Sequence, residues 1–205
     1  MLDNSKVCYI VGGGPSLTGF DFERLRGKTV IAVNYSLKYC PFATYFLSAD
    51  SGVIVTAAQA GFWGCDSTTT KVAIIDQGHK RYKYAKPYLC AYDCTYEPTR
   101  IDGAISLDPN VFASGACSGF SALQFSVKAG FGCIHLLGID CWAQSGRRHF
   151  YSEGNDSAAA RRLDEFASYF IQASPLLKGF GVSVISHSSI SVLNQTYPYS
   201  PLESL

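Results

Sequence analysis

The chain has 205 residues, 47% of them hydrophobic, and its 17 basic and 16 acidic residues leave a net charge of +1. This length suits one compact α/β domain over residues 1–205, and the near-neutral charge excludes a function that depends on an overall basic or acidic surface. No apolar run approaches the ~20 residues needed to cross a bilayer, so no membrane contact is expected. The first residues, M-L-D-N-S-K, lack the features of a signal peptide, which predicts a cytoplasmic protein.

Six apolar runs predict β-strands, at residues 6–11, 29–33, 44–48, 71–75, 133–138 and 182–186. Most of them are continuously apolar rather than alternating, which is typical of strands covered on both faces of a parallel sheet. Helices are predicted between the strands, at residues 21–25, 51–60, 118–129 and 156–173. The last of these has Asp156 or Ser157 as its cap and Leu163, Phe166, Phe170 and Ile171 on one face. The alternation predicts a Rossmann-like, doubly wound, mostly parallel sheet with helices on both faces.

Two stretches interrupt this alternation. Residues 77–113 show no long periodic run and are predicted to form a lid or small insertion, and residues 187–205 are predicted to form an extended wrap. Phe62 and Trp63 are candidates for a contact in a homo-oligomer, with core packing as the alternative.

Eight cysteines are expected to be reduced thiols in a cytoplasmic chain of this size. The stretch C-A-Y-D-C at 90–94 could supply two zinc ligands, with Cys65 or His79 as partners at no recognised spacing. Ordinary loop cysteines are the alternative.

Small and polar residues follow the predicted strands, where ligands bind in open α/β sheets. They are Gly12, Gly13, Gly14, Pro15 and Ser16 after the first strand, Asn34 and Asp50 after the next two, Gly138, Ile139 and Asp140 after the fifth, and His187 after the last. Ser114 and Gly115 precede the third predicted helix, whose N-terminus could bind an anion.

The stretch G-G-G-P-S is predicted to bind phosphate, because glycines let the backbone approach a ligand and present N–H groups to an anion. It matches neither G-x-x-x-x-G-K-[ST] nor G-x-G-x-x-G, and a tight turn without a ligand is the alternative. Asp50 and Asp140 could hold Mg²⁺ against phosphates or bind a ribose, with helix capping as the alternative.

The loop after Asp140 carries the candidates for acid–base chemistry. His149 is the first candidate for the general base and Glu153 the second, while Arg147 and Arg148 suit a phosphate. A solvated surface loop is the alternative. His135 is expected to be a core residue within its strand.

Basic residues and tyrosines alternate over residues 80–88. Such interleaving can bind single-stranded nucleic acid, but a solvated lid is the expected explanation.

The order of these motifs resembles a known family. G-G-G-P-S-L at 12–17, A-V-N at 32–34, S-G at 114–115 and L-L-G-I-D at 136–140 resemble the hydroxymethylpterin pyrophosphokinase-like Rossmann family, which includes many phage and prophage proteins. They are also similar to the related single-domain bacterial sialyltransferases, which use a CMP-activated sugar. The resemblance covers residues 6–200 and implies a nucleotide site, with a phage-encoded protein as one origin.

The resemblance also implies roles for particular residues. Gly12, Gly14, Pro15 and Ser16 match the glycine turn that faces the nucleotide, and Asn34 matches an asparagine that contacts it. Ser114 and Gly115 match the small pair at its phosphate, and residues 138–140 match the segment beside ribose and base. Gly13, Asp50 and Trp142 depart from the sialyltransferases, which have two asparagines and a catalytic tyrosine there.

Three functions follow from these observations. The first is a nucleotide-dependent transferase, a glycosyltransferase in which a CMP-, UDP- or ADP-type sugar nucleotide is the donor and His149 or Glu153 activates an unknown acceptor. The second is a pyrophosphokinase that uses ATP, with Mg²⁺ held by Asp50 and Asp140. The third is a nucleotide-binding protein without catalysis.

Overall fold

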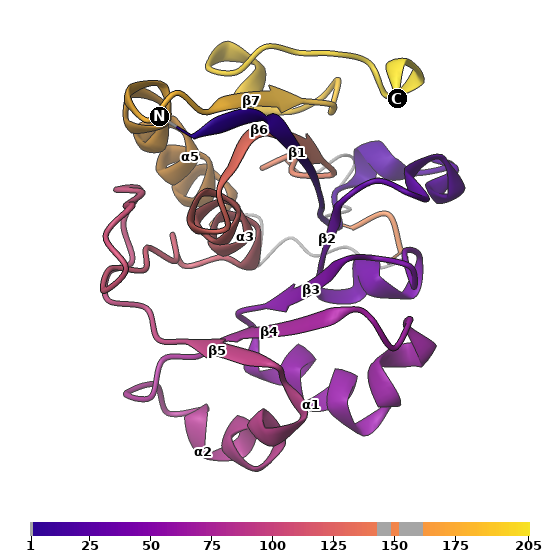
Figure 1. The fold of residues 1–205 in the computed structure, drawn as a ribbon, viewed down its shortest axis with the longest axis vertical. Coiled ribbons are helices and arrows are strands. Elements are labelled where there is room, and N and C mark those ends of the chain that lie inside the picture. The colour runs from indigo at the N-terminus through magenta and orange to yellow at the C-terminus, as the bar shows by residue number, and fades with distance from the viewer. Residues whose placement is uncertain (1, 143–148, 152–161) are drawn as a thin grey trace.

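The computed structural model describes residues 2–142, 149–151 and 162–205. Seven strands form one sheet in the order β5-β4-β3-β2-β1-β6-β7, and all neighbouring strands are parallel (Figure 1). The strands are β1 (Asp3–Val11), β2 (Val30–Val33), β3 (Tyr45–Ser48), β4 (Thr70–Ile74), β5 (Cys94–Tyr96), β6 (Phe131–Leu137) and β7 (Ser183–Ser186). The predicted Rossmann-like α/β class is confirmed.

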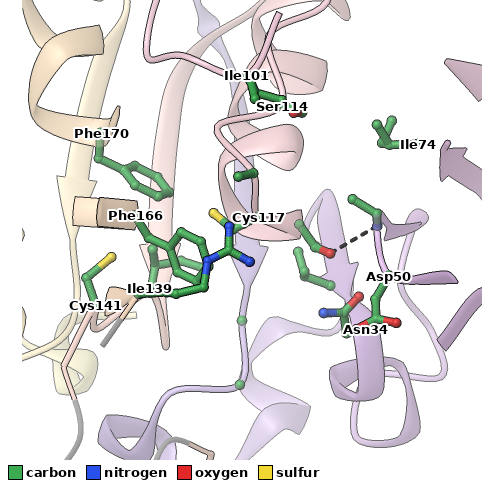
Figure 2. A pocket seen from close by; sticks show the side chains of 18 of the residues that line it. Asn34, Asp50, Ile74, Ile101, Ser114, Cys117, Ile139, Cys141, Phe166 and Phe170 are labelled. Atoms are coloured by element: carbon green, nitrogen blue, oxygen red, sulfur yellow. Dashed lines mark hydrogen bonds between the residues drawn. The ribbon is translucent and has the colours of Figure 1, made fainter. Parts of the chain in front are cut away.

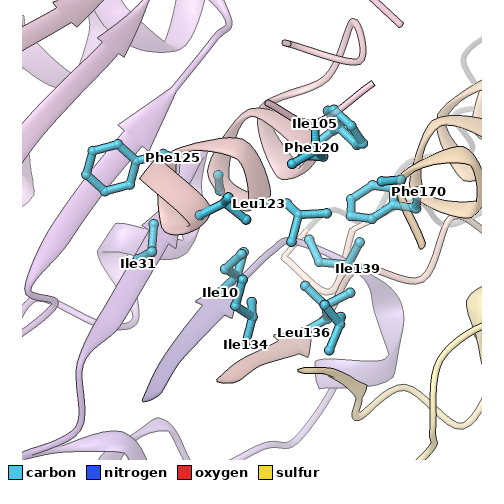
Figure 3. Packing of buried hydrophobic residues seen from close by; sticks show 14 of the residues in the cluster. Ile10, Ile31, Ile105, Phe120, Leu123, Phe125, Ile134, Leu136, Ile139 and Phe170 are labelled. Atoms are coloured by element: carbon cyan, nitrogen blue, oxygen red, sulfur yellow. The ribbon is translucent and has the colours of Figure 1, made fainter. Parts of the chain in front are cut away.

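The helices cover both faces of the sheet, as the continuously apolar strands predicted. They are α1 (Ser51–Gln59), α2 (Tyr82–Ala85), α3 (Ser118–Lys128) and α5 (Leu163–Gly179). Successive strand residues point to opposite faces, so Ile10 joins the core under α3 and α5 while its neighbour Val11 joins the core on the α1 side. Figure 3 shows the first core, where Leu123 of α3 lies over Ile10 and Ile134 of the sheet and Phe170 of α5 lies beside Ile139.

The order in which the chain adds strands to the sheet reverses beside β1. Strands β2 to β5 follow on one side of β1, and β6 and β7 lie on the other side. In an open parallel sheet such a change leaves a crevice at the carboxyl ends of the two central strands. The glycine turn after β1 and the segment after β6 therefore meet at this crevice.

The segment 77–113 supplies a strand that the sequence did not indicate. Its residues 94–96 form β5, the edge strand beside β4, while α2 and a 3-10 turn (Lys86–Ala91) precede it. Three residues, C-T-Y, are too short and too polar to give a hydrophobic signal. Part of the predicted lid thus belongs to the sheet.

The last helix differs from its prediction at both ends. It begins at Leu163 and continues to Gly179, and the predicted caps Asp156 and Ser157 lie outside the described residues. It passes through Pro175, which leaves the carbonyl of residue 171 without its helical donor. Ile171 is exposed, so water can reach that carbonyl, whereas Phe170, predicted to share its face, is buried.

Phe62 belongs to the core rather than to a surface patch. Its ring is buried against Phe46 and Tyr92, and Trp63 is half-buried beside Phe46 and Tyr35. These contacts match the core-packing alternative for both residues.

All eight cysteines are free thiols. In the described part of the chain, no helix is both long and apolar enough to pass through a bilayer.

Candidate functional site

A cleft of about 880 Å³ lies over the carboxyl ends of the strands (Figure 2). Its walls include most of the residues expected there: Gly12, Gly13, Gly14, Asn34, Asp50, Ser114, Gly138, Ile139, Asp140 and His149. Pro15, Ser16 and Gly115 stand behind this wall, among residues that do not line the cleft. Arg148 and Glu153 lie outside the described residues, as does Arg147.

The glycines of the turn are required by close packing against the segment after β6. The N–H of Gly12 donates to the carbonyl of Leu137 (2.8 Å), and the N–H of Gly14 donates to that of Gly138 (2.8 Å). A Cβ on Gly12 would lie 2.5 Å from the Gly138 carbonyl oxygen, and one on Gly14 would strike the Asp140 carboxylate. Two of the N–H groups expected to face a phosphate are therefore used inside the protein.

Asp140 fastens the same turn from the other side. Its carboxylate accepts hydrogen bonds from the backbone N–H of Ser16 (2.9 Å) and from the Ser16 hydroxyl (2.6 Å). The side chain is 2% exposed, and this burial raises the pKa of Asp140 while the bonds from Ser16 oppose the rise. Ser16 and Asp140 thus hold β1 and β6 together and have little capacity left for a ligand.

Asn34 and Asp50 stand on the opposite wall, at the ends of β2 and β3. Asn34 has a φ of +56°, a left-handed conformation that asparagine tolerates, and its Oδ1 accepts from the Ser48 hydroxyl (2.8 Å). That bond leaves the Nδ2 donor of Asn34 for a ligand in the cleft (Figure 2). Asp50 is the N-cap of α1 and accepts from the N–H groups of Gly52 (2.8 Å) and Val53 (3.4 Å).

The N-terminus of α3 forms another part of the cleft wall. Cys117 is its N-cap, and Ser118 and Gly119 carry first-turn N–H groups that have no partner within the helix. Gly115 and Ala116 turn the chain into the helix with φ of +52° and +50°. Ser114 is 5% exposed and lines the cleft, and the Ser118 hydroxyl accepts from the Ala49 N–H (3.0 Å).

His149 also lines the cleft, next to the glycine turn. Its ring stacks on that of Tyr151 with 5.0 Å between centroids and 5° between planes. A Cβ on Gly13 would lie 2.8 Å from the His149 Nδ1 and 2.7 Å from the Tyr151 hydroxyl. Gly13, the middle glycine of the turn, therefore makes room for this histidine and tyrosine.

Three arginines of the cleft were not predicted as site residues. Arg81 precedes α2, Arg100 follows β5, and Arg162 precedes α5. Arg100 pairs with Asp102 (2.5 Å) and Arg162 with Glu165 (3.3 Å), both exposed pairs that contribute little to stability. Arg100 and Arg162 come from segments that contain no motif, so nothing in the sequence indicated them. Arg81 belongs to the basic and aromatic stretch at residues 80–88, which is the one signal that could have identified it.

The arrangement does not favour a metal site. Asp50 caps a helix, Asp140 is bonded to Ser16, and no group of three or more metal-binding side chains occurs within residues 2–142, 149–151 and 162–205. Three of the four carboxylate oxygens of this pair, Oδ1 of Asp50 and both oxygens of Asp140, thus already accept hydrogen bonds within the protein.

A histidine pair outside the cleft lining joins half-buried His135 to buried His187. Nδ1 of His135 in β6 and Nε2 of His187 after β7 are 2.7 Å apart, and the His135 ring also stacks on Tyr9 (4.6 Å). Burial lowers the pKa of His135 to about 4, helped by repulsion from His187 and Lys28, and burial also lowers the pKa of His187. His135 was expected in the core, and it is only half-buried within β6.

We expect the protein to lose stability in mild acid through this pair. Because the pKa is lower in the folded protein than the ordinary 6.5, the unfolded chain takes up protons first as the pH falls. The stability that the neutral pair contributes is therefore complete above pH 6.5 and declines as the pH falls toward 4. The free energy of unfolding should fall by at least ~1 kcal/mol between pH 7 and pH 5, about 2–4 °C in Tm. His135→Phe should show a shallower pH dependence in thermal melts; an equally steep one would contradict this origin. Asp140 titrates in the opposite direction, which makes the variant comparison necessary.

Two solved structures resemble this chain, both of the sialyltransferase CstII from Campylobacter jejuni. The complex with the substrate analogue CMP-3FNeuAc is 15% identical, with a TM-score of 0.59, and the match covers 96% of this chain and 86% of that chain. The complex with cytidine-5'-monophosphate is also 15% identical, with a TM-score of 0.61 and coverages of 97% and 86%. No family model and no curated protein matches.

This likeness extends over nearly the whole chain and shows a shared fold. The fold expected from the resemblance to the sialyltransferases is thereby confirmed, whereas nothing in the likeness supports the hydroxymethylpterin pyrophosphokinase-like family. A phage origin stays a prediction.

Proposed function

We propose that this protein is a glycosyltransferase that takes its sugar from a nucleotide donor. The observation that carries the proposal is the cleft at the sheet's switch point, which brings an amide donor, a helix N-terminus and a histidine to one cavity. The fold shared with a sialyltransferase crystallised with CMP compounds makes a cytidine nucleotide the first donor to test. Below 25% identity the fold does not transfer the activity, so the site must carry the argument.

The donor's phosphate is assigned to the N-terminus of α3. The N–H groups of Ser118 and Gly119 and the positive end of the helix favour an anion, and Ser114 adds a hydroxyl. This assignment moves the phosphate away from the glycine turn, whose Gly12, Gly14 and Ser16 donors are already in use. Arg162, which directly precedes α5, also lines the cleft.

The nucleoside is assigned to the wall made by Asn34 and residues 138–140. The Nδ2 group of Asn34 can donate to a base or ribose oxygen, while Ile139 gives that wall an apolar surface. The Ser48 hydroxyl fixes the amide's orientation, so Asn34 is held ready to donate.

His149 is assigned the role of general base. It would take the proton of an acceptor hydroxyl as the acceptor oxygen forms a bond to the sugar's anomeric carbon. The bond from that carbon to the phosphate oxygen breaks, and its electron pair leaves with the nucleotide. Such a step needs no metal, because the N–H groups of α3 offset the negative charge of the departing phosphate.

The alternative of Mg²⁺-dependent pyrophosphoryl transfer is disfavoured by the same geometry. It requires carboxylate oxygens of Asp50 and Asp140, and three of these four oxygens already accept hydrogen bonds within the protein. A nucleotide-binding protein without catalysis shares the site and differs only in showing no turnover.

Thermal melting against CMP, CDP, UDP, GDP, ADP and ATP, each with Mg²⁺ and with EDTA, tests the proposal. We expect stabilisation by CMP in EDTA, by roughly 2.7 kcal/mol at 100 times the dissociation constant, or about 5–10 °C. Stabilisation by ATP with Mg²⁺ alone would replace the proposal with pyrophosphoryl transfer, and no shift with any nucleotide would contradict a nucleotide site. Binding of a sugar nucleotide without transfer or hydrolysis would favour the non-catalytic alternative.

A further inference from the structure

A connected set of aromatic rings lies beside the cleft, on the other side of the glycine turn. It is named here the aromatic platform and consists of Phe22, Tyr35, Tyr39, Trp63, Phe150 and Tyr151. The Phe150 ring contacts the rings of Phe22, Tyr39 and Tyr151. Tyr151 in turn contacts Tyr35, and Tyr35 contacts Trp63. The centroids of these neighbouring rings are 4.7 to 5.9 Å apart. Four of the six are tyrosine or tryptophan, which combine apolar faces with a polar edge.

The platform contains its own pocket of about 250 Å³. Tyr35, Tyr39 and Tyr151 line it together with Lys38. The Lys38 ammonium lies 5.1 Å from the Tyr35 ring centre and 5.0 Å from that of Trp63, and Lys38 and Tyr39 are exposed. Among the described side chains, no carboxylate forms a salt bridge with this ammonium. The pocket thus offers aromatic surfaces and one positive charge to a small ring-shaped ligand.

The platform joins the cleft at His149. This histidine lines the cleft, and its ring stacks on Tyr151, which lines the pocket. Both side chains pack on Gly13, and the Phe150 N–H donates to the Gly13 carbonyl (2.8 Å), so the backbone fixes the junction. A ligand in the pocket would therefore contact Tyr151, whose ring stacks directly on that of the proposed base.

We propose that the aromatic platform binds the acceptor, and that this acceptor is an oligosaccharide carrying a carboxylate. The catalytic part of this inference rests on the proposed glycosyl transfer. Tyrosine faces pack against the C–H groups of a sugar ring, their hydroxyl groups bind sugar hydroxyls, and Lys38 binds the carboxylate. Lys38, which has no carboxylate partner among the described side chains, is the one cation lining the pocket, and it fits a single carboxylate better than the continuous phosphates of a nucleic acid or a lipid surface, which need several cations.

The experiment measures binding of trigalacturonate and of its methyl ester, in which methyl groups neutralise the carboxylates, by calorimetry in the presence of saturating CMP. We expect the wild type to bind trigalacturonate at least about tenfold more tightly than the ester, a difference of 1.4 kcal/mol. Lys38→Gln should abolish this preference, and Tyr39→Ala should weaken binding of both sugars about tenfold. Tyr84→Ala is the matched control, because Tyr84 is also an exposed tyrosine with a lysine ammonium, that of Lys83, 4.9 Å from its ring. It should leave both affinities unchanged.

CMP binding and melting temperature are recorded for every variant, which separates this inference from the nucleotide site. If CMP binds but trigalacturonate does not, or if Lys38→Gln keeps the preference for the acid, the platform is not an acceptor site. If trigalacturonate binds as expected while no nucleotide does, the glycosyltransferase proposal fails and the platform remains a site for acidic sugars. Binding of oligo(dT) or of phosphatidylserine vesicles that Tyr39→Ala abolishes, without binding of either sugar, would replace the sugar with that partner and overturn the inference.

Discussion

Replacing Gly12 with alanine is expected to destabilise the protein by about 3 kcal/mol or more. The new Cβ would lie 2.5 Å from the carbonyl oxygen of Gly138 and 2.6 Å from the Ile139 side chain. The backbone there cannot shift cheaply, because the N–H groups of Gly12 and Gly14 are bonded to the carbonyls of residues 137 and 138. Overpacking at a site that cannot relax costs at the upper end of the usual range. Urea unfolding, compared at equal m-value, measures the loss.

Gly179→Ala is the matched control for this variant. No atom lies within 4 Å of the Cβ position at Gly179, near the end of α5, so alanine fits and should leave stability unchanged or raise it by up to ~1 kcal/mol. Equal stability of the two variants would show that the glycine turn is not held by close packing. We also expect Gly12→Ala to weaken nucleotide binding, because the turn positions one wall of the cleft.

Replacing His149 with alanine is expected to lower kcat by roughly 10²- to 10⁴-fold, the usual contribution of a general base. The affinity for the nucleotide product should change little, since the phosphate and nucleoside are assigned to α3 and to Asn34. Release of the nucleotide from the sugar nucleotide that binds best, followed by chromatography, gives kcat and KM separately. A fall in kcat with constant product affinity is the outcome that distinguishes a base from a binding residue.

His79→Ala provides the comparison for His149. His79 lines the same cleft, its Nδ1 accepts a hydrogen bond from the Arg81 N–H (3.2 Å), and no part in the transfer is assigned to it. Its replacement should leave kcat within a few-fold of the wild type. If His149→Ala retains full kcat, Glu153→Gln tests the other predicted base. Turnover that survives both changes would show that the loop after β6 does not supply the base.

The glycine turn shows how one sequence pattern can serve another purpose than the one it suggests. Three consecutive glycines after a strand indicate close approach of the backbone to something, and they permit phosphate binding. Here the partners of Gly12 and Gly14 are the carbonyl of Gly138 and the carboxylate of Asp140, and that of Gly13 is the His149–Tyr151 pair. The need for glycine was correctly inferred, but its cause lies in residues more than 120 positions away.

Prediction from the sequence succeeded where a short run of residues reflects how the segment is buried in the fold. The strands later found as β1, β2, β3, β4, β6 and β7 were predicted, because a strand buried on both faces must be continuously apolar. The short β5 was missed because an exposed edge strand does not need such a run. The end of α5 was misplaced because Pro175 indicates a helix stop, whereas burial of Ala173 and Leu177 continues the helix beyond it.

By itself, the sequence determined the α/β class, the parallel sheet and the edge of the sheet where polar residues gather. Those properties depend on hydrophobic burial and turn chemistry, which act on neighbours along the chain. Only the tertiary structure decided which donors remain for a ligand, that Arg81, Arg100 and Arg162 line the cleft, and that Lys38 lies among tyrosines. Whether a polar group is available depends on its hydrogen-bond partners, and here Ser16 meets Asp140 across 124 positions of the sequence.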